Sequence, residues 1–184
     1  YIQEQQIETL DIVVGTHPHE DHIGGLDGVI QTFAPETIVM PKVSSNTKTF
    51  ERVLDAVEAQ NKKIKAAQAG LVLEKGSLTL EFLSPEAGET YHETNNYSAV
   101  IRVCYNGQTF LFTGDAETDI EDRLLEQYDL SGVNVLKAGH HGSATSSSKR
   151  FIDAASPEYA VIMVGAGNSY GHPSEQTLKT LAAD

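Results

Sequence analysis

Apolar runs alternate with amphipathic segments along the first part of the chain. Residues 10–16, LDIVVGT, and residues 37–41, TIVMP, are short apolar runs that predict buried strands. Between them, apolar residues recur at helical spacing over residues 26–33, which predicts a short helix that ends near Pro35. Residues 47–63 repeat that spacing with charged residues on the opposite face, and this pattern predicts an amphipathic helix.

The rest of the chain continues this alternation and adds a hairpin. Residues 77–85, SLTLEFLSP, alternate between apolar and polar as a strand does. Asn106-Gly107 stands between two apolar segments, which is typical of a two-residue hairpin turn. The further predicted elements are a helix at 117–128, a strand at 133–139, a helix at 149–155, a strand at 159–165 and a helix after Pro173. Hairpins combined with alternating strands and helices indicate the α/β (α+β) class, with a mixed sheet layered with helices.

The composition limits the number of domains and the kinds of partner. With 184 residues and 40% hydrophobic content, we expect a single domain over residues 1–184. No apolar stretch approaches the length of a membrane span, and the first residues lack the basic and apolar parts of a signal peptide. The one cysteine, Cys104, excludes an internal disulfide and is expected in the core. Because 26 acidic residues outnumber 13 basic ones, the surface is expected to repel nucleic-acid phosphates unless cations offset its charge.

One segment holds three of the seven histidines. THPHEDHIGG follows the first predicted strand and presents His17, His19, Asp21 and His22 on the loop that leaves it. Neutral imidazole nitrogen and carboxylate oxygen are ligands that zinc, manganese and iron accept in sites that activate water. We therefore expect these four side chains to bind metal.

Several motifs resemble those of one superfamily. HPHEDH is similar to the H-x-H-x-D-H signature of the metallo-β-lactamase superfamily, and FLFTGD, VLKAGHHGS and YGHPS supply Asp115, the His140-His141 pair and His172 in a similar order. With NNYSAVIRV, these motifs look like the metallo-hydrolase domain of ComEC-type competence proteins, over about residues 10–181. The resemblance implies a four-layer αβ/βα sandwich with a metal site at one edge of its two sheets. Because that fold begins with strands ahead of the first motif, we expect the chain to lack those strands and to be a fragment of a larger protein.

The resemblance also implies ligands for two divalent metal ions, zinc or manganese. His17 and His19 would hold one ion, Asp21 and His22 would hold the second, and Asp115 would bridge the two.

The His-His pair leaves two assignments open, because adjacent side chains diverge and seldom bind one ion together. We favour His141 as a ligand to the second ion, with His140 facing the substrate or supporting a ligand, and the reverse stays possible. His172, before Pro173 at a predicted helix start, would bind a substrate phosphate, protonate a leaving group or cap the structure. The candidate catalytic residues are Asp21, which is also a candidate metal ligand, His140 and His172.

One departure from the superfamily concerns the first ion. Many members place a third histidine for it just before a strand, where this chain reads TNNYSAV with Asn95 and Asn96. Asparagine is a weak ligand, so we expect this ion to be weakly held by its two histidines, the aspartate and water. The alternative is that His92 reaches in from the preceding loop, although it reads more simply as an exposed residue.

A site of two divalent ions suits hydrolysis by a metal-bound hydroxide, because such ions lower the pKa of water from about 15.7 toward roughly 7. The chain has no serine elbow, no Cys-His pair and no P-loop. His140 or His172 can neutralise phosphate oxygens, which favours a phosphodiesterase, and the ComEC resemblance narrows this to a DNase linked to competence DNA uptake. The alternatives are a dimetal hydrolase of a small ester, lactone or thioester, and a metal-degenerate structural or binding domain of a membrane channel.

The expected substrate is DNA or another phosphodiester, although few side chains are suited to bind one. Lys137, Lys149 and Arg150 lie near GHHGS, and the run ATSSSKR forms either a small phosphate-contacting lip or an ordinary solvated loop. Aromatic residues are not interleaved as in single-strand binders, since the tyrosines near the predicted site loops are separate in sequence: Tyr91, Tyr97 and Tyr170.

The resemblance implies two further partners. One is a membrane-channel part of the same protein, which would place this domain at the extracytoplasmic face of a bacterial membrane. The other is a second copy of the chain, because sheet edges left without strands invite association.

Overall fold

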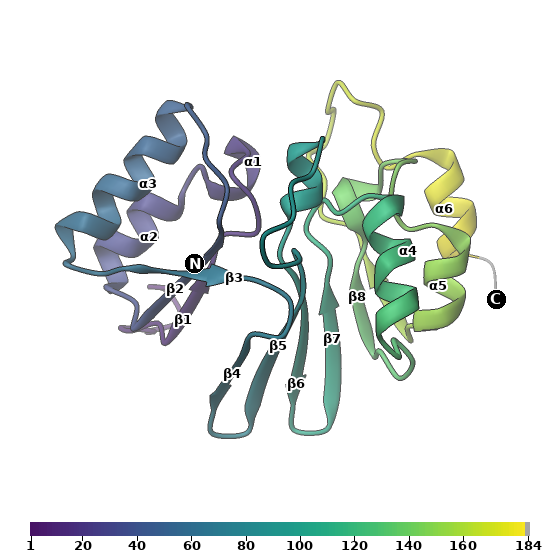
Figure 1. The fold of residues 1–184 in the computed structure, drawn as a ribbon, viewed down its shortest axis with the longest axis horizontal. Coiled ribbons are helices and arrows are strands. Elements are labelled where there is room, and N and C mark those ends of the chain that lie inside the picture. Colours follow the sequence, from purple (N-terminus) through teal and green to yellow (C-terminus); the bar gives the residue numbers. More distant parts are fainter. Residues whose placement is uncertain (183–184) are drawn as a thin grey trace. The chain divides into compact units, whose positions relative to one another are not determined.

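The computed structural model describes residues 1–182 and divides the chain into two compact units, which begin at Tyr1 and Gln68 (Figure 1). They are called unit 1 and unit 2 and are described separately. No helix among residues 1–182 is both long enough and apolar enough to cross a membrane.

Unit 1 is a small parallel sheet covered by helices. Its elements are β1 (Ile12–Val14), α1 (Glu20–Ile23), α2 (Leu26–Phe33), β2 (Thr37–Pro41), α3 (Lys48–Ala59) and β3 (Ile64–Ala67). The strands pair in parallel in the order β1-β2-β3, and α2 and α3 lie side by side (Figure 1). The apolar residues that predicted the helices pack against β2 in one core, which consists of Ile23, Ile30, Ile38, Met40, Val53, Ala56 and Val57.

Local signals explain the limits of these helices. The side chain of Thr47 accepts a hydrogen bond from the backbone N–H of Phe50, which caps the start of α3. The helix α2 ends where Ala34 adopts a left-handed conformation, just before Pro35.

Unit 2 is built on a six-stranded mixed sheet in the order β4-β5-β6-β7-β8-β9. Its strands are β4 (Val72–Lys75), β5 (Leu78–Ser84), β6 (Val100–Tyr105), β7 (Gln108–Phe112), β8 (Val135–Lys137) and β9 (Tyr159–Val161). Its helices are α4 (Thr118–Gln127), α5 (Lys149–Ala155), α6 (Glu175–Leu181) and the 3-10 turns η1 (Thr94–Tyr97) and η2 (Gly139–Gly142). The strands β4 to β7 are antiparallel (Figure 1). The strands β8 and β9 run parallel to β7.

The parallel part of this sheet positions the chemistry. The segments that follow β7, β8 and β9 leave the sheet at the same edge, because parallel strands end on the same side. These segments carry Asp115, the His140-His141 pair and Met163. The core beneath them joins α4 and α5 to the sheet through residues that include Leu111, Leu136 and Phe151.

The predicted α/β class is confirmed, and the predicted hairpin is confirmed in detail. Asn106 and Gly107 both have positive φ, 48° and 79°, as the favoured two-residue hairpin turn requires. Two strands were missed, β3 and β4, because IKAA and VLEK are short and lack clear alternation. Cys104 was expected in the core but is exposed. The last two residues of β6, next to the turn of the β6–β7 hairpin, are both exposed to solvent, although they lie on opposite faces of the strand.

Candidate functional site

The first candidate cluster follows β1 in unit 1 and is called the histidine cluster: His17, His19, Asp21 and His22. The Nε2 atom of fully buried His17 lies 3.0 Å from Nδ1 of His19. The Nε2 atom of His22 lies 3.7 Å from a carboxylate oxygen of Asp21. The cluster therefore contains two pairs of donor atoms, and these are the pairs that the resemblance implies for two ions.

The local backbone of this cluster differs from the prediction. Asp21 and His22 were expected on a loop, and this was wrong, because they lie in the one-turn helix α1. His19 precedes the helix in an extended conformation, with φ −75° and ψ 146°. A helix of four residues is too short to leave a periodic pattern in the sequence.

Thr16 supports the cluster and was missed by the sequence analysis. Its hydroxyl oxygen lies 3.2 Å from Nδ1 of His17 and 3.3 Å from Nδ1 of His22. When both Nδ1–H groups donate to this oxygen, the lone pairs of both rings are on Nε2, where a cation can use them. The sequence signal that could have identified Thr16 is its position directly before His17, the first histidine of the cluster.

The second candidate cluster lies in unit 2 at the sheet edge and is called the Asp115 cluster: Asp115, Glu117, His140 and His141. Asp115 is 2% exposed, and its backbone N–H donates to the hydroxyl of Ser98 at 2.9 Å. The Nε2 atom of His141 lies 3.4 Å from Oδ2 of Asp115. Because the Nδ1 atom of His141 lies 2.8 Å from the carbonyl oxygen of Met163, which only accepts, Nδ1 carries a proton, and in the neutral ring the lone pair is on Nε2.

The adjacent ring of His140 is held by a different set of contacts. Its Nδ1 lies 3.2 Å from the hydroxyl of Thr145, which in turn donates to Glu117 at 3.2 Å. With the hydroxyl proton used in that way, Nδ1 of His140 donates and Nε2 carries the lone pair. This Nε2 lies 3.8 Å from Asp115. Burial lowers the pKa of His140, and the charges of Asp115 and Glu117 partly oppose this shift.

A buried carboxylate anchors the loop after these histidines. Glu121 of α4 is 1% exposed and accepts hydrogen bonds from the backbone N–H groups of Ser147 and Ser148. Burial raises the pKa of Glu121, and these hydrogen bonds partly oppose the increase. Within the run ATSSSKR, this carboxylate therefore holds the backbone at Ser147 and Ser148, whereas Ala144, Thr145, Lys149 and Arg150 are exposed.

The basic residues near this loop are paired within the protein. The Nζ atom of half-buried Lys137 donates to the carbonyl oxygens of Gly114 and Ala138 at 3.2 and 3.0 Å. Lys149 pairs with Asp153 at 2.6 Å, and Arg150 pairs with Asp122 at 2.7 Å. Each of these cations already has a partner.

The asparagines that replace the expected histidine bind Glu117. The Nδ2 atom of Asn95 donates to the Glu117 carboxylate at 3.3 Å, and Oδ1 of Asn96 accepts from the Glu117 backbone N–H at 3.0 Å. His92 does not contact them, since its side chain is 96% exposed and lies 2.8 Å from Glu93. The simpler interpretation of His92, an exposed loop residue, is confirmed.

His172 lies beside His140 on the loop before α6. The centroids of the two rings are 5.6 Å apart, and the ring of Tyr170 is stacked on His172 at a centroid distance of 5.8 Å and an interplanar angle of 21°. The other two tyrosines form a separate pair, with ring centroids 5.0 Å apart: Tyr91 and Tyr97. Tyr170 is thus the tyrosine of these three that adjoins the cluster.

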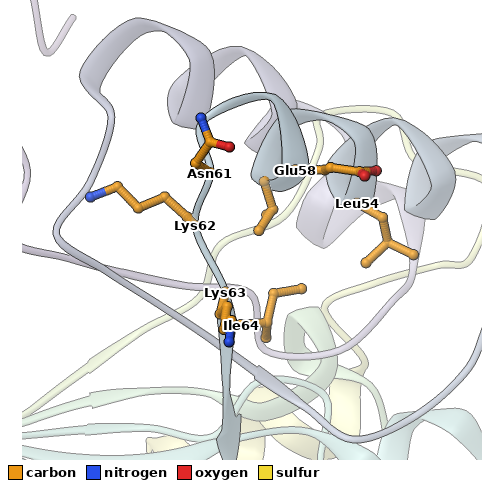
Figure 2. A pocket seen from close by; sticks show the side chains of 7 residues that line it. Leu54, Glu58, Asn61, Lys62, Lys63 and Ile64 are labelled. Carbon is orange, nitrogen blue, oxygen red and sulfur yellow. The ribbon is translucent and has the colours of Figure 1, made fainter.

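A groove on unit 1 lies outside these residues (Figure 2). Its apolar lining comes from Leu54 and Val57 of α3 and from Ile64 of β3, and its polar lining includes Lys62 and Lys63. None of its lining residues belongs to the histidine cluster.

The donor atoms of both clusters fit divalent metal ions. Ligand atoms about 2.0–2.2 Å from a tetrahedral zinc lie roughly 3.3–3.6 Å from one another. The pairs His17–His19, Asp115–His141 and Asp21–His22 are separated by 3.0, 3.4 and 3.7 Å, close to that range. Each pair also presents nitrogen or carboxylate oxygen, which suits zinc or manganese.

Known proteins similar to this chain include a protein named as a competence protein. The chain is 32% identical over 181 residues to ComE operon protein 3 of Bacillus subtilis (strain 168), and the match covers 98% of the chain and 23% of that protein. It is 45% identical over 96 residues to Competence protein ComA of Neisseria gonorrhoeae, and that match covers 52% of the chain and 14% of the protein. The chain therefore spans less than a quarter of the length of these two curated relatives.

The fold is also similar to that of a solved structure. The crystal structure of CmlA, a diiron beta-hydroxylase from Streptomyces venezuelae, matches 95% of this chain and 41% of that chain, with a TM-score of 0.61 and 16% identity. A likeness at that identity shows the fold alone. The family model described as the metallo-beta-lactamase superfamily matches residues 1–166, and the chain therefore belongs to the metallo-β-lactamase superfamily.

Proposed function

We propose that this chain is a metal-dependent phosphodiesterase that acts on DNA in a competence-type uptake system. The observation that carries the proposal is the pair Asp115–His141, in which a buried carboxylate oxygen lies 3.4 Å from Nε2 of the imidazole. In the neutral ring, the lone pair is directed to this atom by the hydrogen bond of the same ring to the carbonyl oxygen of Met163. Such a pair suits a cation, because the carboxylate oxygen and the neutral imidazole nitrogen can each donate an electron pair to the same ion.

Six side chains would hold two divalent ions, zinc or manganese: His17, His19, Asp21, His22, Asp115 and His141. When bound, such ions lower the pKa of water and neutralise the negative charge that develops on a phosphodiester. The contribution of the chain is to fix the ligands. Thr16, when it accepts from both Nδ1–H groups, would hold His17 and His22 in the tautomer that presents Nε2, and the Met163 carbonyl would do the same for His141.

His140 would move a proton during the reaction. Its Nδ1–H donates to Thr145, so Nε2 is the atom that accepts a proton from the attacking water and returns it to the leaving oxygen. His172 lies beside this ring and would contact a phosphate oxygen of the substrate. The carboxylate of Asp21, with 63% of its side chain exposed, is reachable by solvent and would serve as ligand and proton acceptor.

The substrate class rests on the relatives, because this fold alone does not define a reaction. A diiron beta-hydroxylase shares the fold, whereas the relatives that match the sequence include a competence protein. A net charge of −13 opposes binding of a polyanion, so DNA binding by this chain would depend on bound cations and on contacts other than ion pairs. The remaining length of the longer relatives leaves room for a channel part in the same protein, which we propose as a partner.

The test combines metal analysis with hydrolysis assays. We expect the purified chain to bind zinc or manganese and to cleave bis(4-nitrophenyl) phosphate and single-stranded DNA, and we expect a chelator to abolish both activities. Asp115→Ala and His141→Ala should lose metal and activity. His92→Ala, which removes an exposed histidine outside both clusters, should keep both.

Other outcomes would contradict the proposal in distinct ways. Hydrolysis of esters, lactones or thioesters without phosphodiesters would support the small-ester alternative. A chain that binds no metal and hydrolyses none of these substrates would support a structural or binding role.

A further inference from the structure

The loop between β9 and α6 presents an aromatic ring beside the Asp115 cluster. Tyr170 is 81% exposed, although a tyrosine ring usually buries much of its area. The ring is stacked on His172 at a centroid distance of 5.8 Å, and His172 in turn lies 5.6 Å from the ring of His140. A row of three rings therefore leads from Asp115 to solvent.

The loop is held in place by one side chain. The amide nitrogen of Asn168 donates to the carbonyl oxygens of Gly165 and His172 at 3.1 and 2.6 Å. The amide oxygen of Asn168 accepts from the backbone N–H groups of Tyr170 and His172, both at 3.1 Å. These four bonds fix the backbone on both sides of the exposed ring, so the ring is presented without a large ordering cost on binding.

We infer that Tyr170 is a stacking platform for a nucleobase of a single-stranded nucleic acid whose phosphate lies at His140. This inference rests on the proposed phosphodiesterase function and names the substrate form that the site takes. Bases stack on aromatic rings with little dependence on sequence, because every base has a π face. A duplex hides those faces, so the platform selects strands with unstacked bases.

The position of the ring suits such a strand. A stacked strand advances about 3.4 Å for each nucleotide and an extended one advances further, so a base on Tyr170 is roughly two or three nucleotides from a phosphate at His140. The base and the cleaved bond would then belong to the same short segment of strand.

The negative charge of the protein makes a stacking contact at Tyr170 more important for binding a nucleic acid. The basic residues near GHHGS are paired within the protein or donate to backbone carbonyls, as shown for Lys137, Lys149 and Arg150. The overall charge of −13 also repels the strand. Stacking does not depend on opposite charge, and it therefore supplies affinity that ion pairs do not supply in this part of unit 2.

The test measures binding of two fluorescent oligonucleotides of equal length, one with a base at every position and one with abasic sites throughout. Fluorescence anisotropy in calcium buffer reports the dissociation constant independently of hydrolysis. We expect Tyr170→Ala to weaken binding of the base-bearing strand by roughly 5- to 100-fold and to leave binding of the abasic strand unchanged. Tyr170→Phe, which keeps the ring, should bind as the wild type does.

A second tyrosine gives the matched control. Tyr159 is 68% exposed and lies at the start of β9, whereas the Asp115 cluster lies at the opposite ends of the parallel strands. Tyr159→Ala should therefore bind both oligonucleotides as the wild type does. Circular dichroism should show the same fold for all three variants, since both rings are exposed.

The results separate the two proposals. Equal binding of the base-bearing strand by wild type and Tyr170→Ala would overturn the stacking platform, and so would an equal loss for both strands or no binding of oligonucleotide by the wild type. In the first two cases, cleavage of bis(4-nitrophenyl) phosphate by the wild type would leave the phosphodiesterase standing. A stacking effect in a protein that hydrolyses no phosphodiester would instead contradict the proposed function alone.

Discussion

The carboxylate of Asp115 and the imidazole of His141 face each other at 3.4 Å, although the residues come from segments that follow different strands. The two strands, β7 and β8, are parallel neighbours, and this pairing brings their C-terminal segments to one edge. The relationship predicts that the two side chains bind metal together. It also predicts that metal binding needs the negative charge of the Asp115 side chain and not only its size and shape.

Replacement of Asp115 by asparagine tests that prediction. Asp115→Asn keeps the size of the side chain but replaces a charged oxygen by an amide, so we expect the affinity for zinc or manganese to fall at least about tenfold. Competition with a chromophoric chelator measures the affinity. Asp119→Asn removes an exposed carboxylate from α4 and should leave metal binding unchanged. Equal affinities for wild type and Asp115→Asn would exclude this carboxylate as a ligand.

Glu121 predicts a dependence of stability on pH. Burial raises its pKa in the folded state above the value in the unfolded chain, so the protonated form favours folding. The stabilising contribution is fully present below the ordinary carboxyl pKa, about 4.3, and declines as the pH rises through the raised pKa of the folded state.

Glu121→Gln removes this titration while keeping one acceptor for the loop. The free energy of unfolding of the wild type, minus that of Glu121→Gln, should therefore decrease as the pH rises from 4 to 8. Urea denaturation across that range measures both values. Glu126→Gln, an exposed change on the same helix, should show no such trend. A difference that stays constant with pH for Glu121→Gln would contradict the prediction.

The sequence predicted most elements of the fold because their signals are local. The spacing of Phe50, Val53 and Val57 defines α3, and Asn106-Gly107 defines a hairpin with the expected positive φ angles. The strand β3 lacks such signals and becomes a strand through parallel pairing with β2, which is a tertiary effect that a segment of four residues does not reveal. The strand β4 pairs with β5 across the two-residue turn Gly76-Ser77, where Gly76 has positive φ, a local signal that the sequence analysis did not use.

The residue types of the candidate site can be read from the sequence, but its local geometry cannot. His140 and His141 both have positive φ, 45° and 53°, which is uncommon for residues other than glycine. That turn brings Nε2 of both rings within 4 Å of Asp115, and a sequence pattern carries no information about such a conformation. The choice of His141 as the ligand remains a prediction. Its support is the carbonyl of Met163, which lies 22 residues further along the chain.

Gly142 predicts a close approach between two loops of unit 2. It has φ +81°, and a Cβ atom there would lie 2.7 Å from Cβ of Pro173. Gly142→Ala therefore combines backbone strain with a steric clash that separates the His140 loop from the His172 loop. We expect it to destabilise the protein by about 2–4 kcal/mol.

Gly167 separates the two effects. Gly167→Ala also places alanine at positive φ, +70°, but no atom lies within 4 Å of the added Cβ. We expect a loss of about 1 kcal/mol for this control, from backbone strain alone. Thermal unfolding of both variants gives the comparison, and equal losses would show that the loops do not restrict Gly142.

Asn168 predicts that loop order and metal binding can be separated. Its side chain makes four hydrogen bonds to the backbone of the loop that carries Tyr170 and His172. The ligand pair Asp115–His141 makes no hydrogen bond to Asn168 in the part of the chain that the structure describes. Asn168→Ala should therefore lower affinity and kcat/KM for single-stranded DNA about as much as Tyr170→Ala does, while metal content stays at the wild-type value.

Ser169→Ala, an exposed change in the same loop, should alter neither DNA binding nor metal content. A loss of metal in Asn168→Ala would show that the loop supports the ligands themselves, and unchanged DNA binding would show that the ring of Tyr170 does not need a fixed backbone.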